Sequence, residues 1–295
     1  MSKNEIKIDF TKPANVDFLQ NLLVCPLCQA RLNFYPDAIA CTSCAQKFPQ
    51  VQKNCIDLLP HHLVENEWNQ WGERQQEMEQ WYSDLIAIPL HAEWCFANDY
   101  TPYAPLLATL SGLVLDIGGG NGVVRHFLPK DVQYILLEPS LEWLGTEWTL
   151  IAKRYPCMET KPLFVRGIGE YLPFPEQSFD AVLSFWSMNH AHQPEQVFHE
   201  VYRVLRAGGR FLVILEDMEP LWRDFVARSY INLGVTHWAR TFVQKLSCLG
   251  RQKWPLQSDH VRIRESEIQQ WIAGNFQIVR RSWIGQYLTF ELQKI

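Results

Sequence analysis

Long apolar runs are missing from this sequence of 295 residues. No stretch approaches the roughly 18 consecutive apolar residues that a membrane-spanning helix needs. The opening segment, MSKNEIKIDFTKPANVDF, is polar and charged and contains neither an apolar core nor a small-residue cleavage site. It therefore lacks the pattern of a secretory signal. These absences argue against a membrane span and against export, so we expect a cytoplasmic protein.

Concentrated positive charge is scarce, with one exception. The first sixty residues carry 6 basic and 5 acidic side chains, and the whole chain has a formal net charge of −5. This balance disfavours binding of a phosphate backbone by the N-terminal part, because such binding needs a concentrated positive field. The exception is residues 220–264, with 8 basic and 2 acidic side chains interleaved with aromatic ones. That stretch fits a pocket for an anionic small molecule, a surface that stacks nucleic-acid bases, or helices with solvated charges.

An alternation of short apolar runs and helical patterns begins near residue 112. The predicted strands are 113–118, 133–138, 162–167, 179–186, 210–217, 276–284 and 286–294. The predicted helices are 123–128, 140–155, 194–205 and 265–274. This alternation predicts an α/β fold with a doubly wound parallel sheet. Only Gly285 separates the last two runs, which predicts a tight hairpin.

Four of the eight cysteines form two close pairs. Cys25 and Cys28 make the first pair, and Cys41 and Cys44 the second, with twelve residues between the pairs. Four thiolates at this spacing suit tetrahedral Zn²⁺, and a reducing compartment favours metal over disulfides. A four-thiolate site leaves no ligand position for water. We therefore predict a structural zinc ion.

A glycine-rich loop, LDIGGGNG, follows the first predicted strand. Gly118, Gly120 and Gly122 lie between that strand and a helix, where a backbone without Cβ atoms can approach a ligand closely. Glu138 ends the next strand, where it can accept hydrogen bonds from two ribose hydroxyls; the alternative is a tight turn with a solvated glutamate. A carboxylate at Asp116 would repel a pyrophosphate but suits a ligand with ammonium and sulfonium groups. This electrostatic argument favours S-adenosylmethionine over a dinucleotide.

Three segments, VLDIGGGNG, LLEPS and EYLPFPEQSFDAVLSFWSMNHAHQPEQVFHEVYRVLRAGGRFLV, resemble the class I S-adenosylmethionine-dependent methyltransferases. The resemblance covers about residues 112–217 and is greatest to the group that includes quinone-biosynthesis methyltransferases. It implies a Rossmann-like sheet of seven strands whose last strand is antiparallel. The cofactor-binding residues that it implies are Asp116, Gly118, Gly120, Gly122, Glu138 and Ser184. The first four would surround the methionine part, the glutamate would bind the ribose, and the serine would lie beside the cofactor.

One position departs from the pattern of this family. An acidic residue and a small one usually precede the motif E-x-L-P-F, and the acid accepts a hydrogen bond from the adenine amino group. Here Ile168 and Gly169 occupy those positions. We expect adenine to stack on Ile168 and to meet the backbone N–H of Gly169, so that cofactor binding survives the loss of the acid.

The cysteine-bearing segments LLVCPLC and IACTSCAQKFPQVQKNCIDLLP resemble the zinc ribbon of small activator partners of tRNA methyltransferases. The same ribbon also occurs fused ahead of class I methyltransferase domains. Cys55 and Asp57 replace the small and proline residues of its usual closing segment, G-I-P.

The segment SFWSMNHAHQP follows the fourth predicted strand and offers polar side chains to an acceptor. A general base is needed only where the acceptor must lose a proton. His190 is the candidate for an acceptor-facing catalytic group, and the alternative is a structural histidine. The segment lacks an Asn/Asp-Pro-Pro-aromatic motif, which argues against methylation of exocyclic amines of nucleobases. No Pro-Cys follows the strand, which argues against C5 methylation of cytosine.

These observations predict an S-adenosylmethionine-dependent methyltransferase with a small-molecule acceptor, and the basic stretch allows that acceptor to be anionic. One alternative is an RNA methyltransferase that docks ribosomal or transfer RNA through the ribbon. Another is a non-catalytic protein that binds the cofactor or activates an enzyme. The predicted parts are a zinc ribbon over 1–62, a helical lid or linker over 63–111, and the methyltransferase domain over 112–295, with a substrate-side insertion near 218–264.

Overall fold

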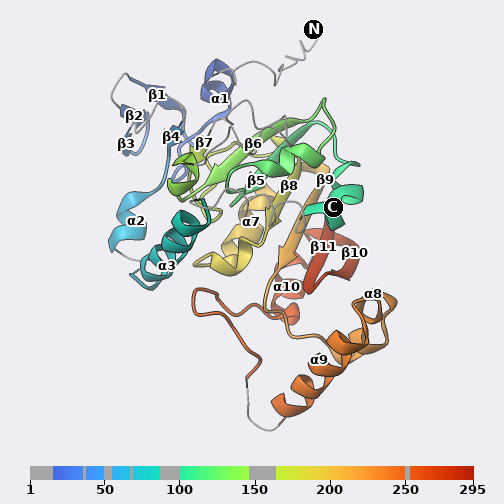
Figure 1. The fold of residues 1–295 in the computed structure, drawn as a ribbon. Coiled ribbons are helices and arrows are strands. Elements are labelled where there is room, and N and C mark those ends of the chain that lie inside the picture. The colour runs from blue at the N-terminus through green and yellow to red at the C-terminus, as the bar shows by residue number, and fades with distance from the viewer. Residues whose placement is uncertain are drawn as a thin grey trace.

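The computed structural model shows a central sheet that joins the N-terminal cysteine-rich unit to the rest of the chain (Figure 1). The structure describes residues 16–35, 38–49, 55–66, 69–86, 100–145, 164–249 and 253–295. Within these residues, no helix has the length and apolar character that a bilayer crossing requires.

Eight strands form the central sheet in the described part of the chain, in the order β10-β11-β9-β8-β5-β6-β7-β4. They are β4 Cys55–Asp57, β5 Leu113–Ile117, β6 Gln133–Glu138, β7 Phe164–Arg166, β8 Phe179–Phe185, β9 Leu205–Leu215, β10 Phe276–Ile284 and β11 Tyr287–Lys294. All pairings from β4 to β9 are parallel. β11 is antiparallel to both of its neighbours, which confirms the predicted antiparallel last strand.

The eighth strand corrects the predicted count of seven. β4 comes from the cysteine-rich segment and pairs in parallel with β7, with Cys55 opposite Phe164. All three of its residues are buried, so they show no alternation between polar and apolar side chains. The partner strand also lies 109 positions further along the chain. No local pattern could therefore have predicted this pairing.

Neighbouring residues of the central strands pack on opposite faces of the sheet. Leu115 and Val213 belong to the core cluster on one face, and Val114 and Leu212 belong to the cluster on the other, with Leu107. Because both faces are covered, the sequence of β5 is a nearly continuous apolar run, and all of its residues are buried. This double burial fixes the strand ends that carry the glycine loop.

The helices agree with the predictions in part. The α-helices are α1 Val16–Leu22, α2 His61–Asn66, α3 Asn69–Ile86, α5 Ala104–Leu107, α7 Pro194–Val204, α8 Arg228–Ile231, α9 Val235–Cys248 and α10 Glu265–Ile272. The short 3₁₀ helices are η1 Thr101–Tyr103, η2 Val123–Phe127, η3 Glu142–Gly145, η5 Met188–His190 and η6 Trp222–Val226. The helix predicted over 123–128 is thus only a 3₁₀ turn. The helix predicted over 140–155 begins with η3, and its residues 146–155 lie outside the described part.

The cysteine-rich unit packs directly on the central sheet. Its strands β1 Leu32–Phe34, β2 Ala38–Cys41 and β3 Lys47–Pro49 form a small antiparallel sheet. Ile39 and Phe48 share a core cluster with Phe174, and the N–H of Val24 donates to the carbonyl of Pro173 at 3.0 Å. The unit is therefore continuous with the main core, while the boundary predicted at residue 62 stays a prediction.

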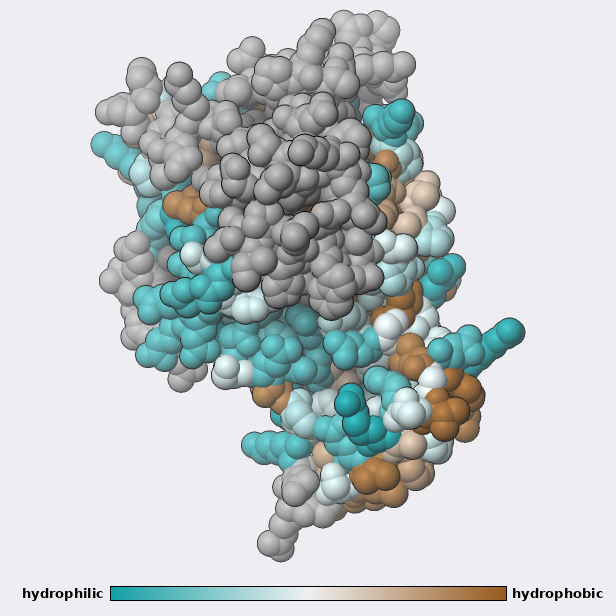
Figure 2. Space-filling view, viewed as in Figure 1, coloured by the Kyte–Doolittle hydropathy of each residue, from teal (hydrophilic) through white to brown (hydrophobic). Residues whose placement is uncertain are grey.

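The helices α8 and α9 project beyond the sheet in Figure 1. Hydrophobic side chains gather on this surface in Figure 2, and the exposed ones here are Trp222, Val226, Ile231, Val235, Val243, Leu246 and Leu249. Several basic groups of this region form ion pairs: Lys245 contacts Glu219, and Arg223 contacts Glu265. The buried Asp224 pairs instead with Arg281. Part of the basic charge of residues 220–264 is thus neutralised locally.

Candidate functional site

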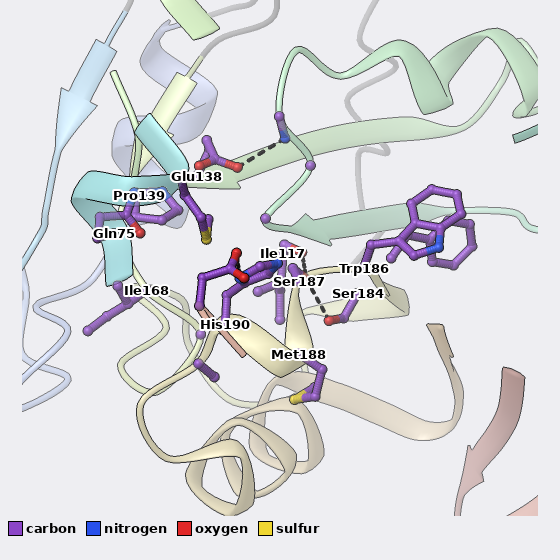
Figure 3. Close-up of a pocket in the computed structure, with 18 of the residues that line it drawn as sticks. Gln75, Ile117, Glu138, Pro139, Ile168, Ser184, Trp186, Ser187, Met188 and His190 are labelled. Atoms are coloured by element: carbon purple, nitrogen blue, oxygen red, sulfur yellow. Dashed lines mark hydrogen bonds and ion pairs between the residues drawn. The ribbon is translucent and has the colours of Figure 1, made fainter. Parts of the chain in front are cut away.

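A cavity of about 630 Å³ lies at the carboxyl ends of the parallel strands (Figure 3). Its wall includes Ile117 at the end of β5, Glu138 at the end of β6, Ser184 and Phe185 of β8, and Glu216 just after β9. From β5 the chain builds β6 and β7 on one side and β8 and β9 on the other. Ligands of open α/β sheets bind at this point of reversal, so the cavity occupies the expected position.

The glycine loop forms one wall of the cavity. Gly118 and Gly120 have φ of +67° and +57°, a conformation that side chains disfavour. A Cβ on Gly118 would overlap the side chain of Ser187, and one on Gly120 would lie 3.3 Å from the indole of Trp143. The Ser187 hydroxyl in turn donates to the carbonyl of Ile117 at 2.7 Å. Glycine is therefore needed here for both conformation and space.

Glu138 is fixed by the loop that it faces. One carboxylate oxygen accepts the N–H of Gly120 at 3.0 Å, drawn in Figure 3, and the other accepts the N–H of Ser140 at 2.9 Å. Its side chain is buried, and this burial raises the pKa of the carboxyl to about 7. Each oxygen retains a second lone pair, so the carboxylate can still accept hydrogen bonds from a ligand.

The structure brings most of the predicted site residues to one cavity. Those that line it are Gly118, Gly120, Glu138, Gly169, Ser184 and His190. Asp116 and Gly122 are not among the lining residues. The Asp116 carboxylate instead accepts the hydroxyl of Tyr134 at 2.6 Å and lies behind the loop, against Gly119. Burial raises the pKa of Asp116 to about 7. The cofactor contacts predicted for all of these residues stay predictions.

Ile168 and Gly169 also line the cavity, where the sequence lacks the usual acid. The next residue, Glu170, is buried and accepts the N–H groups of His192 at 2.7 Å and Gln193 at 3.1 Å. This carboxylate therefore ties the segment after β7 to the segment after β8. It is a structural tie that the sequence did not indicate.

The helix α3 covers part of the cavity with aromatic and polar side chains. Gln75, Met78 and Tyr82 line it, and the ring of Tyr82 lies 4.7 Å from that of Trp143, between centroids. Trp81 also lines the cavity and is 57% exposed, so this wall opens to solvent. The lid predicted over 63–111 is compatible with this placement.

A cluster of histidines and carboxylates forms another part of the wall. The Nδ1 of His190 lies 3.4 Å from Asp259, and its Nε2 lies 3.9 Å from Glu216. The Nε2 of His260 lies 3.6 Å from the same Glu216, and its Nδ1 lies 2.9 Å from Asp217. Of these five residues the sequence singled out only His190. Glu216 lies in the last two residues of the predicted strand 210–217, which is a usable signal, whereas Asp259 and His260 lie in a loop without a pattern.

The four paired cysteines meet as the spacing predicts. Cys25 Sγ lies 3.7 Å from Cys44 Sγ, and Cys28 Sγ lies 3.4 Å from Cys41 Sγ. The edges of a tetrahedron with Zn–S bonds of about 2.3 Å measure about 3.8 Å, so the four sulfurs fit a zinc ion. The residue after each pair has a positive φ, 61° at Gln29 and 59° at Ala45. The two turns thus have the same shape and point their thiols at one centre.

Comparisons with known proteins agree with this geometry. Residues 115–213 match the family described as "Methyltransferase domain". A ubiquinone/menaquinone biosynthesis C-methyltransferase UbiE of Bartonella tribocorum is 29% identical over 145 residues, which are 48% of this chain and 55% of that protein. The UbiE protein of Hahella chejuensis is 43% identical over 155 residues, 50% of this chain and 58% of that protein. The chain thus spans little more than half the length of these relatives.

Among solved structures, one chain of a complex is similar to this chain. The complex is that between the Haloferax volcanii Trm112 methyltransferase activator and a methyltransferase. The match covers 72% of this chain and 97% of that chain, at 15% identity and a TM-score of 0.48. At this level the likeness carries no functional argument.

Proposed function

We propose that this protein transfers a methyl group from S-adenosylmethionine to a small-molecule acceptor. The observation that carries the proposal is one cavity at the strand ends, bounded by the Gly118–Gly120 loop and by Glu138. The match of residues 115–213 to a methyltransferase domain supports it independently.

The residues present fit this cofactor. Glu138 offers acceptor lone pairs to ribose hydroxyls, and the backbone of the glycine loop lies open to the ligand because no Cβ covers it. Ile168 and Gly169 supply an apolar wall and a backbone N–H for adenine. When bound, S-adenosylmethionine supplies an electrophilic methyl group on its sulfonium. The protein then has to align the acceptor and exclude competing water.

The acceptor that the wall favours is aromatic and carries hydroxyl groups. Tyr82, Tyr100, Trp143, Trp186 and Tyr287 all line the cavity and can stack on a planar ring. No Lys or Arg is among the described lining residues. An anionic acceptor is therefore not favoured. The names of the relatives point the same way, because they place those proteins in the biosynthesis of quinones.

His190 is the group that we propose to face the acceptor. It lies on η5, directly after β8, and lines the cavity together with Ser184. Its side chain is 17% exposed, so the imidazole is largely shielded but reachable from the cavity. A hydroxyl of the acceptor would lie against this imidazole, which burial keeps neutral by lowering its pKa to about 4.

Calorimetric titration with S-adenosylhomocysteine tests the cofactor assignment. We expect binding by the wild-type protein and a loss of about tenfold or more in affinity for Glu138→Ala, since two hydrogen bonds to a charged group disappear. Glu142→Ala, an exposed acid on η3, is the matched control and should bind as the wild type does. Absence of binding by the wild type would overturn the proposal. Transfer of a labelled methyl group into RNA instead of into small molecules would favour the alternative of an RNA methyltransferase.

A further inference from the structure

We propose that the wall of the cavity formed by His190, Asp259 and His260 is a second metal site, which binds a divalent first-row transition-metal ion. Each of the three residues offers one ligand atom, and these atoms lie within 4.8 Å of one another. All three line the cavity, so an ion there could accept a further ligand from it. This site differs from the cysteine site, whose four thiolates close the coordination sphere.

The spacing of the polar atoms supports an ion between them. The distance from His190 Nδ1 to Asp259 Oδ2 is 3.4 Å, longer than an ordinary hydrogen bond. Ligands on a tetrahedral ion with bonds of about 2.1 Å are about 3.4 Å apart. His190 and Asp259 are thus spaced as neighbouring ligands of a metal, and the ligand atom of His260 lies within 4.8 Å of both.

A carboxylate behind His260 supports the same conclusion. The Nδ1 of His260 lies 2.9 Å from Asp217 Oδ2, which also accepts the N–H of Gln257 at 2.7 Å. With Nδ1 donating to Asp217, the lone pair of His260 is on Nε2, the nitrogen on the side of Glu216. Asp217 holds this position with φ of +50°, which is uncommon for a residue with a side chain.

The ligands come from segments that a buried asparagine holds together. The side-chain amide of Asn189 donates to the carbonyl of Glu216 at 3.1 Å and accepts the N–H of Glu216 at 3.0 Å. The carbonyl of Asn189 accepts the N–H of Val261 at 2.7 Å. Glu216 takes part in these bonds itself, His190 is the neighbour of Asn189 in the chain, and His260 is the neighbour of Val261. The cluster is therefore preorganised, because its three segments cannot separate without breaking these bonds.

Charge and ligand type indicate which ion would bind. Glu216, Asp217 and Asp259 surround two histidines, and the guanidinium of Arg74 interacts with Asp259. Carboxylates concentrate cations, whereas imidazole ligands favour Zn²⁺, Fe²⁺ or Co²⁺ over Mg²⁺ or Ca²⁺. The use of the ion rests on the proposed function. It would bind a hydroxyl of the acceptor and lower the pKa of that hydroxyl.

Metal counting on the full chain tests the site without any methyl transfer. Protein treated with a mild chelator is titrated with Co²⁺ alone, and bound metal is counted by mass spectrometry after gel filtration. We expect the wild type to bind one equivalent more than His260→Ala and Asp259→Asn. Asp217→Asn, which keeps all three ligands, should weaken binding of that equivalent about 10–100-fold.

The matched control is His192→Ala, because His192 lies near the cluster and does not line the cavity. It should retain the extra equivalent. Equal metal content in the wild type and in both ligand variants would overturn the proposal. A circular dichroism spectrum and a thermal midpoint like those of the wild type show that each variant is folded. Failure of the cofactor titration described above would leave this metal count unchanged, so the two proposals are separable.

Discussion

Protonation of Glu138 controls the predicted cofactor affinity at the scale of a single residue. Burial raises the pKa of its carboxyl to about 7, and only the ionised form accepts hydrogen bonds with both oxygens. Affinity for S-adenosylhomocysteine should therefore rise about tenfold per pH unit below pH 7 and become constant above it. Calorimetry across neutral pH measures this. Glu138→Gln should bind weakly and lose this dependence, and any dependence that it keeps would come from the other buried carboxyls with a raised pKa, Asp116 and Glu170.

Among the charged groups of the N-terminal unit, we expect Asp57 to contribute most to stability. It is fully buried and pairs with Arg166 at 3.0 Å and His61 at 3.2 Å. Asp57→Ala leaves the Arg166 guanidinium without this partner and should lower the free energy of unfolding by about 3–5 kcal/mol, measured by denaturant titration. Glu195→Ala removes an exposed contact with His199 and should cost less than about 1 kcal/mol. Equal losses in both variants would contradict this explanation.

The glycine loop is the element whose shape the cofactor site most requires. Gly118→Ala would force a side chain into φ of +67° and against Ser187. We expect the affinity for S-adenosylhomocysteine to fall more than tenfold and stability to fall by about 1–3 kcal/mol. Calorimetry and denaturant titration measure the two effects.

Gly274→Ala separates backbone strain from the clash in the loop. Gly274 has φ of +74°, but nothing lies within 4 Å of its added Cβ, and it does not line the cavity. The variant should therefore lose some stability and keep its affinity. A normal affinity in Gly118→Ala would show that the loop does not contact the cofactor.

Elements with a strong local pattern were predictable from the sequence, and elements defined by distant contacts were not. The strands of the main sheet are apolar runs of sufficient length, and the glycines mark the loop between β5 and β6. β4 has three buried residues, and only its pairing with β7 makes it a strand. The predicted helix after the loop is the 3₁₀ helix η2, with Gly122 before it in a left-handed conformation and Leu128 after it in an extended one.

The candidate site shows the same division. Glu138 and Gly118 lie at strand ends, where the order of strands brings them to one edge of the sheet. His190 follows β8 and was predicted for that reason. Asp259 and His260 reach the cavity through hydrogen bonds made by Asn189 and Asp217, and no spacing in the sequence records these bonds.

At the scale of the whole molecule, the cysteine site should stabilise more than its own segment. Cys25 and Cys41 belong to the same core cluster as Phe174 and Val182. Cys28→Ser combined with Cys44→Ser should therefore lower the thermal midpoint of the whole chain in a single transition. Circular dichroism and bound-zinc measurement check this. Cys248→Ser, which changes a cysteine outside the cluster, should have little effect. A separate early transition with an unchanged main transition would contradict the shared core.

The pairing of β4 with β7 also sets an order of events during translation. β4 leaves the ribosome 109 residues before the strand that it pairs with. The cysteine turns are local, so they can bind zinc and fold early, whereas β4 has to wait for β7. A segment made early thus docks only after β7 has emerged, and the nascent chain must keep the short run Cys55–Asp57 unpaired until then.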